Sequence, residues 1–318
     1  MKMVSSENEK LLHFTADKIE RLDKFLSEKL DVSRNQVEGL IKKELVKINK
    51  KTAKKGGIKL KQNDKIEVTI PNLKEKKTKK ADFDIPVLYE DDDLIVINKP
   101  PGIVVHPAPS VKEATLVDWL KQNNYSLSTI AGEERFGIVH RIDKETSGAL
   151  VIAKNNKTHA FLSAQLKDKS MGRYYLMLLN APLKEAKCID APIGRNPKNR
   201  IKMAVVNNGK NAKTLFVPFF ENLTAAKLFT GRTHQIRVHL SRIGRYIIGD
   251  TTYGAKNQNS RVMLHAYELY LTHPNGKKLS IIAPIFDDFK QNLPKGFNYE
   301  KMGSVADIFN DYNRMCSK

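Results

Sequence analysis

Apolar residues in the first 70 positions change from a helical to an alternating spacing. Two segments repeat at intervals of three and four, which predicts amphipathic helices, and two later segments alternate with polar residues, which predicts short strands. The helical positions are Ile19, Leu22, Phe25, Leu26 and Leu30, then Val37, Leu40 and Ile41; the alternating ones are Val46, Ile48, Ile66, Val68 and Ile70. Ser33 and Gln36 form a capping-box pair before the second helix. We expect helix, helix, strand, lysine-rich loop, strand.

Beyond residue 86, apolar runs of strand length are interspersed with helical patterns. The expected strands are Asp93–Lys99 and Arg173–Leu179, and the expected helices are Thr115–Lys121, Asn156–Asp168 and one that begins near Thr233. A further apolar run, Ala149–Ala153, follows a polar loop that an apolar pair, Ile138 and Val139, precedes. This arrangement predicts a strand, a functional loop and a second strand.

Charge is the first compositional feature that changes the picture. The 318 residues carry a net charge of +20, and the first 80 hold 22 Lys and Arg against 12 Asp and Glu. Such an excess favours a polyanionic partner, either nucleic acid or an anionic membrane surface. No apolar run approaches the ~20 residues of a transmembrane helix, and the N-terminus lacks the apolar region of a signal peptide. Cys188 and Cys316 form no metal-ligand cluster, and we expect free thiols in a reducing cytoplasm.

Changes in composition divide the chain into five segments. They are an N-terminal extension (1–16), a small domain (17–70), a charged flexible linker (71–85), a large domain (86–290) and a tail (291–318). In the tail, Val305, Ile308 and Phe309 predict a short amphipathic helix.

The polar loop from Gly137 to Leu150 is the first candidate for chemistry. Asp143 lies at its centre, Arg141 precedes it by two residues, and Gly148 ends the loop where unusual backbone angles are useful. An isolated loop aspartate is usually a turn or cap residue, so the surrounding pattern decides. His-Arg-Ile-Asp followed by Thr-Ser-Gly resembles the signature of the pseudouridine synthases that act on large-subunit ribosomal RNA.

Other segments strengthen this resemblance: Asn98 to Pro107, Arg173-x-Tyr175, Gly231 to Leu240 and Arg261 to Ala266. It implies an α+β catalytic domain with a mixed, mainly antiparallel sheet and a central cleft. It makes Asp143 the catalytic carboxylate, Arg232 its ion-pair partner and Tyr175 the aromatic that stacks on the target uracil. The implied RNA or substrate contacts are His140, Arg141, Thr146, Arg173, His234, Gln235, Arg237 and Leu264, and Lys99 and His106 are interpreted as structural.

Residues 17–70 resemble the S4 RNA-binding domain, which implies phosphate contacts from Arg21, Lys24, Arg34, Lys42 and Lys43. The sequence departs from that family at Glu44 and Lys50, where glycine is usual, and it has Tyr246 where many synthases have proline. These changes concern the geometry of turns.

Isomerising uridine to pseudouridine breaks the N1–C1′ bond, rotates the base and joins C5 to C1′. No redox or phosphoryl step occurs, so we expect no cofactor, and the sequence has no P-loop and no GxGxxG motif. We also expect no metal, because His234 and His239 would lie about 140° apart on a helix at about 100° per residue. Asp143 acts either as nucleophile at C1′ or as base at C2′, and Tyr175 is the candidate base or relay for the C5 proton.

Two other functions remain open at this point. One is a non-catalytic RNA-binding assembly factor, and the other is a glycosidase-type hydrolase, which would usually need two carboxylates. The expected partner is large-subunit ribosomal RNA or a ribosome precursor, with transfer RNA as the alternative substrate. We expect a monomer in the cytoplasm without membrane contact.

Overall fold

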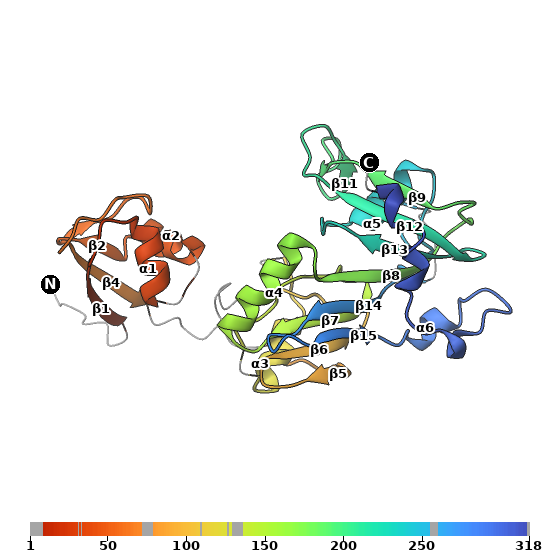
Figure 1. The fold of residues 1–318 in the computed structure, drawn as a ribbon, viewed down its shortest axis with the longest axis horizontal. Helices are drawn as coiled ribbons and strands as arrows, with labels where there is room; N and C mark the ends of the chain where they lie inside the picture. The colour runs from red at the N-terminus through yellow and green to blue at the C-terminus, as the bar shows by residue number, and fades with distance from the viewer. Residues whose placement is uncertain are drawn as a thin grey trace.

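The computed structural model describes residues 9–316 except 31, 33, 72–78, 109, 126, 129–135 and 255–259. These residues form a small N-terminal domain and a large domain, each with its own hydrophobic core (Figure 1). Among the described residues, no helix is both long and apolar enough to cross a bilayer.

The small domain packs two helices on a four-stranded sheet of order β1-β4-β2-β3. Leu22, Phe25, Leu26 and Val37 are buried at the predicted helical spacing. The elements are β1 (Glu9–Thr15), α1 (Leu22–Leu30), α2 (Arg34–Lys42), β2 (Val46–Ile48), β3 (Lys51–Thr52) and β4 (Lys65–Pro71). The predicted capping residue Ser33 lies outside the described residues.

The prediction of an N-terminal extension over 1–16 is wrong for its second half. β1 pairs with β4 in antiparallel register from Glu9 opposite Pro71 to Thr15 opposite Lys65. The segment is therefore an edge strand of the small domain. Its apolar residues, Leu11, Leu12 and Phe14, are too few and too close to charges to show this from the sequence alone.

The turns that lack the expected glycines keep a glycine-like backbone. Glu44 and Lys50 have φ of 60° and 67°, in the left-handed region that favours glycine. Asn49 supports the second turn, because its amide donates to Asp64 and its side-chain oxygen accepts from the Lys65 N–H. The substitutions therefore change the cost of the turns and leave their shape intact.

The large domain is built on a nine-stranded sheet. Its order is β5-β6-β7-β14-β8-β13-β12-β9, with β15 paired to β14. Every neighbouring pair is antiparallel except β7 with β14, which confirms the mixed, mainly antiparallel sheet. The strands are β5 (Val87–Glu90), β6 (Leu94–Lys99), β7 (Ser147–Ala153), β8 (Gly172–Leu178), β9 (Lys187–Asp190), β12 (Lys213–Phe220), β13 (Leu223–Leu228), β14 (Leu264–Thr272) and β15 (Lys278–Ile282).

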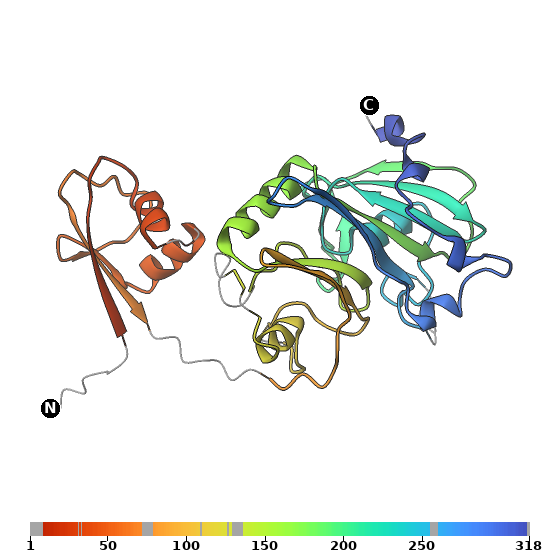
Figure 2. The same cartoon turned by 60° about the horizontal axis from the view of Figure 1, so that its bottom comes forward.

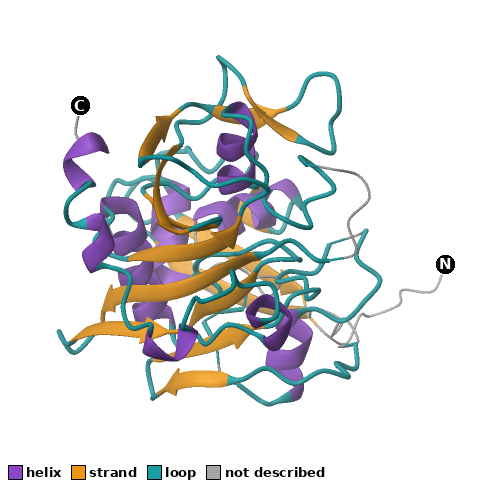
Figure 3. Cartoon of the chain, turned by 90° about the vertical axis from the view of Figure 1, so that its right-hand side faces the viewer, coloured by secondary structure: helices purple, strands orange, loops and turns teal. Residues whose placement is uncertain are grey.

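Helices lie against this sheet (Figure 3). They are α3 (Leu116–Gln122), α4 (Asn156–Asp168), α5 (Gln235–Arg242) and α6 (Asp287–Lys290), and a separate ribbon pairs β10 (Ile193–Arg195) with β11 (Met203–Val205). The predicted helix over Asn156–Asp168 is confirmed at both ends. It begins at Asn156 because the Asn155 side chain caps it by accepting from the Thr158 N–H. Tyr246 uses an amide that proline lacks, since its N–H donates to Asn180.

Part of the predicted linker belongs to the large domain. The N–H groups of Lys79 and Ala81 donate to the side chains of Asp118 and Gln122 on α3, and Ala81 and Ile85 are buried. The predicted flexibility is therefore wrong for residues 79–85, which are held by hydrogen bonds that charge patterns do not reveal.

The tail packs on the large domain as three short 3₁₀ turns, where an amphipathic helix was predicted. They are η1 (Tyr299–Lys301), η2 (Asp307–Phe309) and η3 (Asn313–Cys316). Glu268 on β14 accepts from the Ser304 hydroxyl and from the Val305 N–H, and Phe309 stacks on Tyr174 with ring centroids 4.9 Å apart. Figure 2 shows these residues, in dark blue, along the outside of the domain.

The prediction of two free thiols is also wrong. Cys188 on β9 and Cys316 in η3 form a disulfide, with their Cα atoms 5.7 Å apart. A separation of 128 residues concealed this pairing, which depends on the tail returning to β9.

Candidate active site

The loop that carries Asp143 is fixed at both ends by β-structure. Ile138 makes an isolated bridge with Ile152, where a full strand was expected, and β7 begins at Ser147. Gly148 has φ of 115° and lies where β7 approaches β14 so closely that a Cβ would collide with the backbone of Ala266. The glycine therefore serves the parallel pairing of two strands, just beyond the loop that it was expected to end.

Lys99 holds the same loop through a hydrogen bond to its backbone. Its ammonium group is fully buried and donates to the carbonyls of Pro100, Ile103 and Lys144 at 2.6, 3.0 and 3.1 Å. Burial lowers the pKa of Lys99 to about 7, although the negative charges of Glu145 and Asp143 oppose this shift. Because Lys144 follows Asp143 directly, this contact positions the backbone next to the carboxylate.

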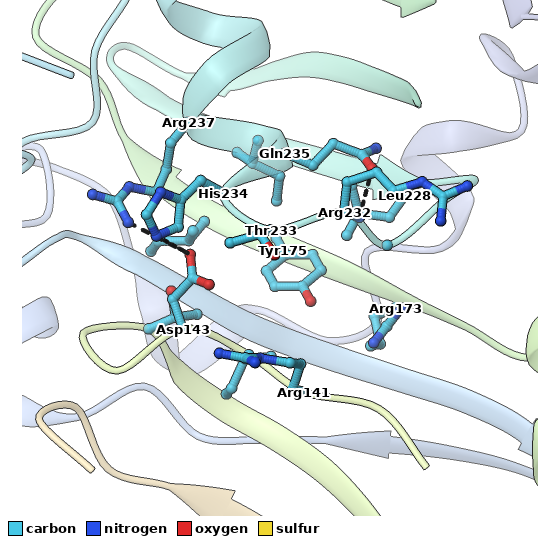
Figure 4. Close-up of a pocket in the computed structure, with 15 residues that line it drawn as sticks. Arg141, Asp143, Arg173, Tyr175, Leu228, Arg232, Thr233, His234, Gln235 and Arg237 are labelled. Atoms are coloured by element: carbon cyan, nitrogen blue, oxygen red, sulfur yellow. Dashed lines mark hydrogen bonds and ion pairs between the residues drawn. The ribbon is translucent and has the colours of Figure 1, made fainter. Parts of the chain in front are cut away.

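Asp143 opens into a small pocket of about 90 Å³. Ile142 and Thr146 come from its own loop, Tyr175 from β8 and Leu264 from β14. Figure 4 shows the Tyr175 ring between Asp143 on one side and Arg173 on the other. Burial raises the pKa of Tyr175, so the phenol stays protonated at neutral pH. Tyr174, its neighbour on β8, faces the tail on the opposite side.

The arginine beside Asp143 is Arg237, which corrects the predicted pairing with Arg232. Arg237 Nη1 lies 3.5 Å from Asp143 Oδ2, and its Nε and Nη2 donate to the two oxygens of Asp250 at 2.7 and 2.8 Å. Arg232 lines the pocket but is exposed, and its Nε donates to the carbonyl of Asn211. The chain turns at His234, so the first turn of α5 directs Arg237 toward the loop.

Sequence reasoning overlooked the role of Asp250. This carboxylate is almost fully buried, and it also accepts from the N–H groups of Thr252 and Tyr253. A bidentate carboxylate fixes the plane of a guanidinium, which leaves Nη1 free to face Asp143. The Gly249-Asp250 pair in the sequence was the available signal.

His234 and Gln235 shape the pocket from the other side. His234 has a left-handed backbone, its Nδ1 contacts the Tyr253 hydroxyl at 3.0 Å, and its Nε2 lies 3.9 Å from Asp143 Oδ2. Burial lowers the pKa of His234, so the ring is neutral at neutral pH and this contact is not an ion pair. Gln235 is buried, and its side-chain oxygen accepts from the Thr230 hydroxyl and the Arg232 N–H, which holds the segment that precedes α5 in place.

His140 and Arg173 contact each other behind the pocket. Arg173 Nη1 lies 2.8 Å from His140 Nδ1, and the Val151 N–H donates to His140 Nε2. Burial, with help from the Arg173 charge, lowers the pKa of His140 far below its ordinary value. This places His140 as a support of the loop. Arg141 is exposed at the mouth of the pocket (Figure 4).

His239 points away from this site. Its ring nitrogens contact the Thr214 hydroxyl and the Ala191 carbonyl, so it does not face His234. Within the described ranges, no group of three or more His, Cys, Asp or Glu side chains is arranged to hold a metal ion.

Comparison with known proteins places this pocket in context. Residues 93–242 match the RNA pseudouridylate synthase family, and residues 20–66 match the S4 domain. An RNA pseudouridine synthase of Helicobacter pylori, itself uncharacterised, is 49 % identical over 304 residues, which cover 90 % of this chain and 93 % of that protein. The chain belongs to the RNA pseudouridine synthase family. Its members isomerise uridine in RNA, so the pocket around Asp143 is the candidate active site.

Other relatives of this synthase agree. The ribosomal large subunit pseudouridine synthase D of Nitrosomonas europaea is 37 % identical, with 91 % of each chain covered. The solved structure of human RNA pseudouridylate synthase domain containing 1 has a TM-score of 0.54 at 25 % identity, and the match covers 65 % of this chain and 86 % of that one.

The S4 domain of the synthase presents only part of the predicted basic set freely. Arg34, Lys42 and Lys43 are exposed on or just after α2. Arg21 donates twice to Asp23, and Lys24 lies within 4 Å of Glu20 and Glu28. The first three are therefore the better candidates for phosphate contacts.

Proposed function

We propose that this synthase isomerises uridines in large-subunit ribosomal RNA, as a monomer in the cytoplasm, with Asp143 as its catalytic carboxylate. The observation that carries the proposal is the pocket itself. It brings one carboxylate, one buried tyrosine and an apolar wall together within a single chain. A glycosidase-type hydrolase would usually need a second carboxylate to activate water, and Asp250 is already bound on both oxygens by Arg237.

Asp143 is proposed to act on the ribose, either at C1′ as a nucleophile or at C2′ as a base. Both roles require the ionised form in a pocket that RNA will close to water. Arg237 supplies the opposing positive charge, and Asp250 keeps its guanidinium oriented. The ion pair between Arg237 and the half-buried Asp143 is therefore in place before the substrate arrives.

Tyr175 is proposed to stack on the flipped uracil, with Leu264 on the pocket wall and Thr146 beside the base. Extracting a base from structured RNA costs a few kcal/mol, and stacking on an aromatic ring returns part of that cost. The neutral phenol, whose pKa is raised by burial, is also proposed to relay the proton that leaves C5. Arg232 and Arg141 are exposed at the pocket and are proposed to contact RNA phosphates.

The ribosomal substrate is supported by the relatives named for the large ribosomal subunit and by the S4 domain. A transfer RNA remains the alternative substrate. Mapping pseudouridines in all RNA from cells with and without the gene decides between them. Loss of sites in large-subunit RNA is the expected result, and loss confined to transfer RNA would contradict the proposal.

Asp143→Asn tests the catalytic role, with exposed Asp92→Asn as the control. Asp143→Asn should bind RNA as the wild type does and form no pseudouridine, whereas Asp92→Asn should remain active. Substantial turnover by Asp143→Asn would refute the mechanism. If the wild-type protein binds RNA but never forms pseudouridine, the chain is an assembly factor.

The role of the S4 domain is tested by replacing Arg34, Lys42 and Lys43 together with glutamine. Each lost phosphate contact should reduce the slope of log affinity against log salt by about 0.7 to 0.9. The triple variant should therefore lose about 2 to 3 in slope while its pocket chemistry is retained. An unchanged slope would exclude these residues from the RNA interface.

A further inference from the structure

A second pocket adjoins the candidate active site. It encloses about 300 Å³, at the lower end of the range typical of small-molecule sites. The two pockets share Arg141, Arg173, Leu228 and Gly231 in their walls. Whatever fills the second pocket therefore lies next to whatever fills the first.

The lining of the second pocket combines positive charge with apolar surface. Arg141, Arg173 and Lys169 supply three cations, and the apolar side chains include Leu166, Met171 and Phe229. Among the described lining residues, none carries a carboxylate. An anion with an attached planar or apolar group suits this lining, and a nucleotide has both parts.

Arg173 gives independent support for an absent anion. Its side chain is only 8 % exposed, yet among the residues that the structure describes none accepts a hydrogen bond from its Nε. Its Nη1 is occupied by His140. A buried donor without an acceptor is costly, and a phosphate oxygen is the strongest acceptor that RNA offers to a guanidinium.

We propose that the second pocket binds the nucleotide next to the target uridine, and that Arg141 and Arg173 hold the phosphate between the two. This proposal rests on the proposed function, because it takes the first pocket to be the uridine site. The base of this neighbouring nucleotide lies against Phe229 and the apolar wall. Lys169 contacts the other phosphate of the neighbouring nucleotide, on the side away from the target uridine. The enzyme thus reads the identity or flexibility of a neighbour in addition to the uridine.

A double-mutant cycle between protein and RNA tests this. The probe is a short synthetic RNA around one mapped uridine, with an abasic nucleotide on either its 5′ or its 3′ side, and the variant is full-length Phe229→Ala. In the wild type, one of the two abasic RNAs should lose roughly 5- to 150-fold in kcat/KM, the range expected for one base–aromatic contact. In Phe229→Ala the intact RNA should lose a similar factor, and the abasic change should then have little further effect.

Phe161→Ala is the matched control, because Phe161 is an exposed aromatic on α4 that does not line the pocket. It should show the full abasic penalty. Equal abasic penalties in the wild type and in Phe229→Ala would overturn the proposal while leaving the proposed function intact. Absence of pseudouridine from the wild-type reaction would instead overturn the proposed function.

Lys169→Gly replaces the aromatic variant if Phe229→Ala does not fold. Lys169 is the C-cap residue of α4 and has φ of 69°, which glycine adopts without strain, so the variant should fold. Lost contact with one phosphate should reduce the salt slope of log kcat/KM by about 0.7. Lys167→Ala, exposed on α4 outside the pocket, should keep the wild-type slope. An unchanged slope in Lys169→Gly would overturn the proposal.

Discussion

Breaking the disulfide between Cys188 and Cys316 should destabilise the large domain strongly. The bond joins residues 128 apart, and in the chain-entropy model a closed loop of that length is worth about 5 kcal/mol. This value is an upper estimate, because the unfolded chain retains some structure. Without the bond the tail still keeps its stacking on Tyr174 and its hydrogen bonds to Glu268. Cys316→Ser should therefore lower the free energy of unfolding by several kcal/mol and leave the tail docked at low denaturant.

Urea unfolding of the full chain, followed by tryptophan fluorescence of Trp119 in the large domain, measures this loss. Wild type in reductant should unfold like Cys316→Ser. Cys188→Ser and the double serine variant should match the single variant, because all three remove the same bond. Such non-additivity separates the bond from the packing of either cysteine.

The thiol count gives the sharpest refutation. Fully denatured protein without reductant should react with a thiol reagent at neither cysteine. Two reactive thiols, or equal unfolding with and without reductant, would show that the tail is held by packing alone.

Three further predictions concern single side chains. Burial of Lys99 lowers its pKa from 10.5 to about 7 in the folded state. Between these two pH values the unfolded chain binds more protons than the folded chain, so the free energy of unfolding should rise with pH, by up to about 1.4 kcal/mol per pH unit. Lys99→Met should remove this rise when urea denaturation is compared at pH 7.5 and 9.5, and a variant with the same pH dependence as the wild type would contradict the prediction. Lys50→Gly should stabilise the S4 domain by about 0.5 to 1 kcal/mol in thermal unfolding, because the left-handed backbone costs lysine more than the extra chain entropy of the unfolded state costs glycine. Lys51→Gly in β3 should instead destabilise the domain in the same experiment. Arg237→Lys keeps a charge but not the bidentate geometry, so kcat should fall about 100-fold, against less than about threefold for Arg232→Lys; the reverse order would mean that Arg232 replaces Arg237 beside Asp143 once RNA binds.

Local sequence was sufficient for the parts of the site that lie on one strand or loop. Asp143 belongs to a contiguous signature, and Tyr175 follows from alternation on β8, which directs it to the pocket and Tyr174 to the tail. The choice between Arg232 and Arg237 was different, because it depends on Asp250, a residue from another segment. The tail was equally hidden, since Glu268 and Cys188 lie far from it in sequence.

The charges around Asp143 suggest how the pocket separates its two tasks. At one end Arg237 lies between two carboxylates and His234 is neutral, so this cluster carries no excess positive charge to attract phosphate. At the other end Arg141 and Arg173 also line the second pocket, where none of the described lining residues carries a carboxylate. We therefore expect the phosphate of an entering nucleotide to be attracted to the arginine end, which would orient its ribose toward Asp143. Arg141→Glu should consequently raise KM in steady-state kinetics, while kcat, which reports the chemistry at Asp143, changes much less.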